Sequence, residues 1–299
     1  MPDLALTRRG FCIAGSAAAV LPAAAAVAAN TPPLSAADLV SRIDPTGAGA
    51  FVAGSGETLV TGVMVAISPS IATLRKAQAA GCNLIISPET PWYGRQAPPP
   101  ADPNAPGAAM AARTVEALAA DPTFAEKKRL IEDGKLAFYR LPDKTTRAVA
   151  DALADRMGWR GDKAEGDAAI YTPRGATLRS VVKGVQTKLG AKGGLRIIGD
   201  PAMPLKRILI VPGTVDLVPT AAALRGADAM ICGDLREWEL VEYFFDSRNA
   251  GQPKALIAIG RILTEQPYAE VLAAQFRAAA PGLNVVMNRR ADPFWRIQA

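Results

Sequence analysis

The sequence predicts an α/β fold with an internal duplication. Apolar runs of strand length alternate with amphipathic runs of helix length through most of the 299 residues. A segment in the second half of the chain also repeats a segment in the first half. This alternation is typical of a sheet with helices on both faces, and ligands of such sheets bind beyond the carboxyl ends of the strands.

The repeat relates residues 63–89 to residues 208–234, which align without a gap. Both segments read as strand, loop, helix, glycine turn and second strand, and they end in Glu89 and Asp234. Unrelated α/β units share part of this order, but ungapped agreement through to the terminal carboxylate favours an internal duplication. The duplication places both carboxylates at strand ends, where a ligand is expected.

Helices and strands of the first lobe follow from capping residues and apolar runs. In chain order they are a helix from Ser35 to Ile43, a strand over 60–67, a helix from Ser70 to Gly81, a strand over 84–86, a helix from Asp121 to about Glu132, a strand over 136–139, and helices over 143–157 and 177–189. We expect the first lobe to span residues 30–190, with a Pro-rich surface loop over 94–107. The second lobe then spans residues 191–299.

Residues 1–29 are predicted to be a signal peptide outside the globular fold. Arg8 and Arg9 precede an Ala-rich apolar run that closes in Ala26-Val27-Ala28-Ala29, a sequence typical of a cleavage site. Paired arginines indicate the twin-arginine route of bacteria. The alternative is a chance Arg-Arg before an anchor helix, which Pro22 disfavours. We expect a periplasmic or exported protein with no membrane association after cleavage.

The composition narrows the chemistry available to the protein. The chain has no histidine, and its 34 Lys and Arg residues exceed its 28 Asp and Glu residues by six. The basic residues are spread along the chain, so we expect no nucleic-acid partner. Cys82 and Cys232 lie in or beside apolar strands, which favours buried thiols over a disulfide. Without histidine, Ser or Cys triads are excluded, and the sequence contains no phosphate-binding glycine loop.

Three strand-type segments end in residues that could carry chemistry. They are residues 83–93 (NLIISPETPWY), 136–146 (LAFYRLPDKTT) and 256–267 (LIAIGRILTEQP). In this order they resemble the motifs of the Nif-three-like family, whose members have a dinuclear metal centre and some of which are assigned a GTP cyclohydrolase I type 2 activity. The resemblance runs over most of the chain that follows the signal peptide.

The resemblance implies two related α/β lobes that face a shared cleft, a homo-oligomer that is commonly a hexamer, and metal ligands at the three motifs. The family has His-His or His-Glu before Pro in the first motif and Gly-His-x-x-x-Glu in the third. Here Pro88, Pro142 and Arg261 stand where histidines are expected. A guanidinium cannot donate a lone pair to a metal, and its charge repels one.

The ligands that remain by this resemblance are carboxylates. Glu89 and Glu265 are the candidate metal ligands, and Asp143 is a possible third. Two such carboxylates in a partly buried cleft would repel each other. We therefore hypothesise that Arg261 replaces the charge of the metal and bonds to both.

Further residues could line the cleft, and most also have a simple structural interpretation. Asp143 is suited to cap a helix, and Glu265 is expected in the first turn of a helix capped by Thr264, where the macrodipole favours a carboxylate. Asp234 and Glu237 lie at a predicted strand–helix junction, where capping of the helix is the default role. The cleft candidates are Arg261, Asp234, Glu237, Arg140, Trp92 and Tyr93. Of these, Arg140 is expected in a solvated turn, and the two aromatic residues are expected to pack against the loop.

Two functions are compatible with these residues. The first is an exported family member with a degenerate metal centre, which keeps its scaffold and cleft for binding or assembly and needs no cofactor. The second is a hydrolase that acts on a nucleotide or similar heterocycle, with Mg²⁺, Mn²⁺ or Ca²⁺ on the carboxylates. We favour the first because of the missing histidines and Arg261, and because GTP is not an expected substrate outside the cytoplasm.

Overall fold

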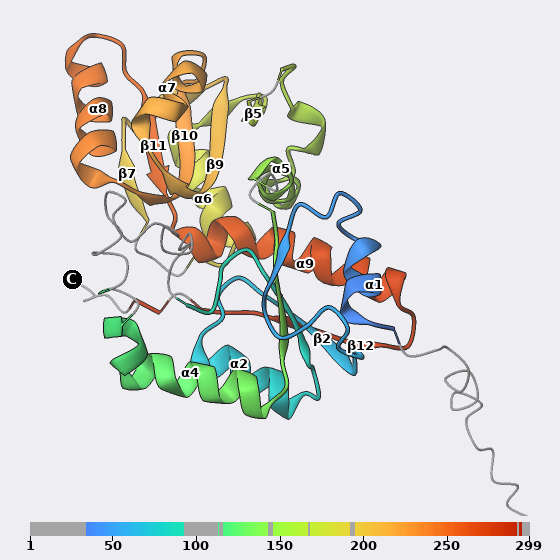
Figure 1. Cartoon of the computed structure of the whole chain (residues 1–299). Helices are drawn as coiled ribbons and strands as arrows, with labels where there is room; N and C mark the ends of the chain where they lie inside the picture. Colours follow the sequence, from blue (N-terminus) through green and yellow to red (C-terminus); the bar gives the residue numbers. More distant parts are fainter. Residues whose placement is uncertain are drawn as a thin grey trace, which may run out of the picture. The chain divides into compact units, whose positions relative to one another are not determined.

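The computed structural model describes residues 34–92, 113, 116–142, 146–166, 168–191, 195–291 and 293–294. Within these ranges the chain forms two five-stranded sheets with helices on both faces, which confirms the predicted α/β fold with two lobes (Figure 1). The predicted signal peptide and the Pro-rich loop over 94–107 lie outside the described residues.

The first sheet has the strand order β1-β4-β3-β2-β12. Strands β2, β3, β4 and β12 run parallel, and β1 is antiparallel to β4. Their bounds are β1 Ala50–Ala53, β2 Gly62–Ala66, β3 Leu84–Ser87, β4 Ala137–Arg140 and β12 Asn284–Asn288.

Helices cover both faces of this sheet because its strands are apolar on both sides. Val63 and Val65 of β2 pack against α1 (Ala36–Ser41) and α9 (Arg261–Ala279). Met64, between them, points to the other face, where α2 (Ile71–Ala79) and α4 (Pro122–Asp133) lie side by side (Figure 1). The alternation follows from the two-residue period of a strand, and strands buried on both faces are typical of parallel sheets.

The second sheet has the order β5-β9-β10-β11-β7. Its three central strands are parallel, and the edge strands are antiparallel to their neighbours. The bounds are β5 Ile170–Tyr171, β7 Arg196–Ile198, β9 Ile208–Val215, β10 Ala229–Leu235 and β11 Ala255–Ala258. Strands β6 (Ala176–Thr177) and β8 (Pro204–Leu205) form a separate pair.

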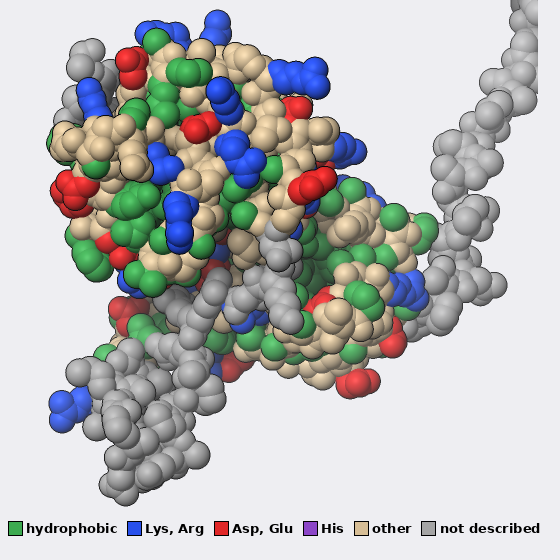
Figure 2. Space-filling model, turned by 90° about the horizontal axis from the view of Figure 1, so that it is seen from above, with side chains coloured by type: hydrophobic (Ala, Val, Ile, Leu, Met, Phe, Trp, Pro, Cys, Tyr) green, Lys and Arg blue, Asp and Glu red, His purple; other side chains and the backbone are tan. Residues whose placement is uncertain are grey.

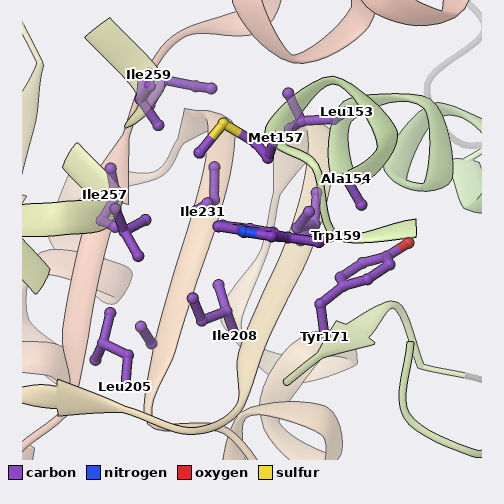
Figure 3. Close-up of a cluster of buried hydrophobic side chains, with 14 of the residues drawn as sticks. Leu153, Ala154, Met157, Trp159, Tyr171, Leu205, Ile208, Ile231, Ile257 and Ile259 are labelled. Carbon is purple, nitrogen blue, oxygen red and sulfur yellow. The ribbon is translucent and has the colours of Figure 1, made fainter. Parts of the chain in front are cut away.

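Helices also cover both faces of the second sheet. On one face α5 (Thr146–Met157) and α6 (Leu178–Lys188) pack on Ile208, Ile231 and Ile257. Trp159 and Tyr171 lie against these strands beside α5 (Figure 3). On the other face lie α7 (Leu217–Arg225) and α8 (Glu237–Asn249). A short 3₁₀ turn, Arg160–Asp162, follows α5 in the chain.

The strand register supports the duplication. Val63 pairs with Leu84 in the first sheet, and Ile208 pairs with Ala229 in the second. These are the positions that the ungapped alignment equates. Both copies therefore form a parallel strand–helix–strand unit with the same register.

Sheet membership does not follow the predicted boundary after residue 190. Strand β12, near the end of the chain, pairs with β2 of the first sheet. Helices α5 and α6 instead cover the second sheet, because their apolar faces pack on β9, β10 and β11. Each lobe is thus completed by a segment from the other half of the sequence.

Local sequence explains where several of the helices begin. The Ser70 hydroxyl accepts a hydrogen bond from the Thr73 N–H at 3.2 Å, so the predicted N-cap of α2 is confirmed. Asp121 caps α4, with Pro122 at the first helical position. The predicted buried thiols are also confirmed, since Cys82 and Cys232 are buried and unpaired in separate clusters.

Candidate ligand-binding cleft

A cavity of about 520 Å³ lies at the carboxyl ends of strands from both sheets. The loops after β2, β3 and β4 line it from the first sheet, and residues 211–214 of β9 line it from the second. Helices α5 and α9 complete its wall. Most of the lining is apolar: Val65, Ala66, Ile67, Ile86, Leu141, Val149, Val211, Ala269 and Leu272. Its position at strand ends is the one expected for a ligand site in α/β proteins.

Three charged side chains form a cluster in this cavity. The Nη2 of Arg261 donates a hydrogen bond to Glu89 Oε1 at 2.6 Å. Its Nε donates to Glu265 Oε1 at 2.9 Å, and Nη2 also lies 3.4 Å from Glu265 Oε2. The guanidinium therefore lies between the two carboxylates, in the arrangement that the sequence hypothesis describes.

Solvent reaches only a small part of this cluster. The side chains of Arg261, Glu89 and Glu265 are 24%, 20% and 10% exposed. Burial raises the pKa of Glu265 above its ordinary value; the neighbouring guanidinium acts against this, and the carboxylates of Glu89 and Asp234 add to it. Burial also acts to lower the pKa of Arg261, but its two carboxylate partners outweigh that effect, so the pKa is raised. The ionised cluster depends on Arg261 because nothing else named here offsets the burial of Glu265.

The start of α9 fixes the geometry of the cluster. Gly260 precedes the helix with φ +81°, a conformation that favours glycine, and Arg261 is the first helical residue. Glu265 follows one turn later on the same helix face. The prediction that Thr264 caps this helix is wrong: the helix begins three residues earlier, and the Thr264 hydroxyl donates to the Arg261 carbonyl at 2.8 Å. Glu265 is thus in the second turn, where the macrodipole has less effect.

Two predicted cleft residues, Asp234 and Glu237, lie near the start of α8. Asp234 and Glu237 do not cap α8, because its N-cap is Arg236 and that residue makes no side-chain capping bond. Asp234 lines a second cavity, described below. Glu237 forms an ion pair with Arg196 on the surface.

Trp92 does not line either cavity. Its ring packs on Phe124 of α4 with centroids 5.0 Å apart, and its Nε1 donates to the Val52 carbonyl at 3.4 Å. Arg140 ends β4 and pairs in register with Ser87 and Ala50. Tyr93 and Asp143 lie outside the described residues.

Among the polar side chains of the cavity wall, the sequence analysis missed those of Thr214 and Tyr268. Tyr268 lines the cavity, and burial raises the pKa of its hydroxyl. A signal was available, because Arg261, Glu265, Tyr268 and Leu272 recur at spacings of three and four residues and so share one face of a helix. The misplaced helix start concealed this face.

A second cavity of about 650 Å³ lies at the start of α9, where residues 260–263 line it. Three arginines (Arg196, Arg261 and Arg290) and Asp234 line it, together with apolar side chains. Arg261 therefore lines both cavities. Arg290, which follows β12, was not predicted as a site residue.

Comparison with known proteins assigns the fold. In α/β proteins, a cleft at the carboxyl ends of the strands is the usual position of a ligand site. Residues 139–293 match the family model of Duf34/NIF3 (NGG1p interacting factor 3). The match covers more than half of the chain, and the chain belongs to this family. A search of curated proteins found no match.

Solved structures agree with the family assignment. Staphylococcus aureus hypothetical protein SA1388 is 18% identical, with a TM-score of 0.66, over 89% of this chain and 100% of that chain. A Bacillus cereus protein related to NIF3 is 13% identical, with a TM-score of 0.67, over 89% and 100%. HcgD from Methanocaldococcus jannaschii, in its reduced form, is 11% identical, with a TM-score of 0.61, over 86% and 99%. These similarities show a shared fold.

The described ranges contain neither a metal-binding group of side chains nor a helix suited to span a membrane. No group of three or more His, Cys, Asp or Glu side chains there is arranged to hold a metal ion. No helix in the same part of the chain is long and apolar enough to cross a membrane.

Proposed function

We propose that this protein is an exported NIF3-family member with a degenerate metal centre, whose cleft binds a small ligand without a dinuclear metal. The position of Arg261 carries the proposal. Its guanidinium bonds to both Glu89 and Glu265, the two carboxylates that match the family's ligands. One positive charge thus stands where the family's metal charge is expected.

The chemistry of the donor set does not fit the family's centre. Transition metals are held in proteins chiefly by imidazole and thiolate ligands, and the chain has no histidine. Among the described residues that line the cavity, two carry carboxylates, Glu89 and Glu265, and both already accept hydrogen bonds from Arg261. A metal ion would have to displace a guanidinium that is better matched to two carboxylates than a point charge is.

The rest of the cavity favours a largely apolar small molecule. Its volume, about 520 Å³, is in the usual range for small-molecule sites. Aliphatic side chains of both sheets and α9 form most of the wall, and the charged cluster occupies one end. An apolar wall with a few polar groups is the usual design of a site that binds and orients a ligand.

Two parts of the proposal rest on sequence and family. Export through the twin-arginine route to the periplasm rests on the pattern of residues 1–29. Assembly into a homo-oligomer, a hexamer, rests on family membership. Fractionation of the native host tests the first, and sedimentation or light scattering of the purified protein tests the second.

Metal analysis tests the proposal directly. We expect protein purified without chelators to contain no stoichiometric metal. Arg261→His should then bind Zn²⁺ or Mn²⁺, because it supplies an imidazole between two carboxylates. The matched control is Arg129→His, since Arg129 also pairs with two carboxylates, Glu126 and Asp133, on the exposed face of α4. Equal metal binding by the two variants would contradict the proposal.

The alternative function is a divalent-metal-dependent hydrolase that acts on a nucleotide or similar heterocycle. It requires Arg261 to turn away so that Glu89, Glu265 and Asp143 can hold Mg²⁺, Mn²⁺ or Ca²⁺. What favours it is that two carboxylates meet in a cavity at the strand ends. A stoichiometric metal in the native protein, lost on Glu89→Gln, would select this function over the first.

A further inference from the structure

We propose that the second cavity binds a small molecule through an oxyanion, a phosphate or a carboxylate group. The cavity is separate from the cluster described above except for its shared wall, Arg261. The proposal does not depend on the metal-free function, because Arg290, its main residue, takes no part in that cluster.

Arg290 presents a guanidinium that has no partner in the described part of the chain. The residue is half-buried and lines the cavity. Its backbone N–H donates to Gln266 Oε1 at 3.1 Å, which fixes the chain against α9. The adjacent Arg289, by contrast, is exposed and pairs with Glu270 at 2.8 Å. Two neighbouring arginines thus differ: one has its counter-ion in the protein, and the other faces a cavity.

Arg261 lines the same cavity and adds donors. Its Nε and Nη2 are taken by the two glutamates, whereas Nη1 has no hydrogen-bond partner among the residues described. Guanidinium groups bind carboxylate and phosphate oxygens through paired N–H donors. We infer that the two guanidinium groups that line this cavity contact different oxygens of one anion.

The other charges of the cavity do not cancel this arrangement. Arg196 has its own counter-ion, since it pairs with Glu237. Among the described residues that line the cavity, Asp234 is the single carboxylate, and it is exposed. Elsewhere the surface is mixed: on the face in Figure 2, Lys and Arg side chains are interspersed with Asp and Glu, and neither sign forms a continuous patch. Three arginines around one cavity stand out against that background.

The start of α9 adds a smaller contribution. Ile262 and Leu263 lie in its first turn and line the cavity. Backbone N–H groups in a first turn have no partner within the helix, and Gly260 provides no side-chain cap. A helix start of this kind favours an anion but would not by itself define a site. Here the first turn lies in the wall of a cavity that Arg261 and Arg290 also line.

The walls indicate what else the ligand carries. Ile259, Ile262, Leu263 and Phe294 give the cavity apolar surface beside the arginines. A ligand that combines an oxyanion with an apolar part fits these walls better than a free inorganic ion. The class we infer is a small organic phosphate or carboxylate.

Titration of the purified protein with inorganic phosphate and, separately, with acetate tests the inference. Calorimetry or NMR should detect saturable binding at constant ionic strength, which holds general screening fixed. The probe that binds more tightly identifies the head group. We expect Arg290→Gln to weaken binding about tenfold, the size typical of a lost hydrogen bond to a charged group. Arg290→Lys, which keeps the charge but loses the paired donors, should lie between.

The matched control is Arg289→Gln, which removes the same charge one residue away. Wild-type affinity in this control, with the loss confined to Arg290, would support the inference. No saturable binding of either probe at millimolar concentration would overturn it, and so would equal losses in both glutamine variants. Thermal unfolding of each variant verifies that the fold is kept. The Arg261→His metal test is a separate measurement, so failure of one proposal is distinguishable from failure of the other.

Discussion

Arg261→Met isolates the role of the guanidinium between the two carboxylates. Methionine keeps an unbranched apolar side chain at the start of α9 but supplies no donor. Glu265 and Glu89, which accept hydrogen bonds at 2.9 and 2.6 Å in the native protein, then lose their shared cation. Both carboxylates stay in a cavity where 10% and 20% of their side chains are exposed.

The size of the effect follows from this burial. Removing one partner of a fully buried ion pair costs about 3–5 kcal/mol, whereas exposed pairs contribute about 0–1 kcal/mol. The cluster lies between these limits but nearer the buried one, so we expect a loss of about 2–3 kcal/mol of unfolding free energy at pH 7. In a chain of this size that corresponds to a fall in Tm of roughly 4–10 °C.

The pH dependence has a defined sign. The pKa of Glu265 is already raised by burial, and it rises further when the guanidinium that lowers it is removed. A group with a raised folded pKa contributes stability below its unfolded pKa and loses it as the pH rises through its folded pKa. The deficit of Arg261→Met relative to the native protein should therefore shrink as the pH is lowered from neutrality.

Chemical denaturation of both proteins at several pH values measures this deficit. The control is Arg129→Met, which removes a guanidinium from two exposed carboxylates on α4 and should leave stability near that of the native protein. Adding Glu265→Gln to Arg261→Met should recover part of the loss, since the unpaired buried charge is then gone. A pH-independent deficit, or one no larger than that of the control, would refute the role assigned to Arg261.

Two further predictions concern the framework. Gly233→Ala should lower the unfolding free energy by at least about 2 kcal/mol, because a Cβ there would lie 2.4 Å from the Gly213 carbonyl oxygen; Gly161→Ala, with nothing within 4 Å, is the control in the same denaturation assay. Tyr139→Phe should cost about 1–2 kcal/mol, since its hydroxyl donates to Asp44 Oδ2 at 2.6 Å. A phenylalanine variant as stable as the native protein would mean that the loop at Asp44 is held by its other bonds.

The central strands and their helices were predictable because several local signals agree there. Apolar runs mark β2, β3 and β4, and the caps Ser70 and Asp121 mark the starts of α2 and α4. Edge strand β12 was not anticipated, because its pairing with β2 depends on a contact between opposite ends of the chain. Sequence patterns report local periodicity. They do not specify which part of the chain provides the edge strand of a sheet.

The site was predictable where the chemistry is local and not where it depends on a helix boundary. The contact between Arg261 and Glu265 follows from their four-residue spacing. The resemblance to the family motifs predicted that Glu89 lies in the same site. Thr264 carries a hydroxyl that can cap a helix, yet the N-cap of α9 is Gly260. Arg290 carried no signal, because its place beside the cavity depends on how the end of β12 meets α9.

Because Arg261 lines both cavities, binding in one cavity affects the affinity of the other. A ligand in one cavity that draws the guanidinium towards itself alters the donors left for a ligand in the other. By linkage, the second ligand must change the affinity of the first by the same factor. The two cavities are therefore coupled through a single side chain, and the sign of that coupling depends on whether both ligands need the same position of the arginine.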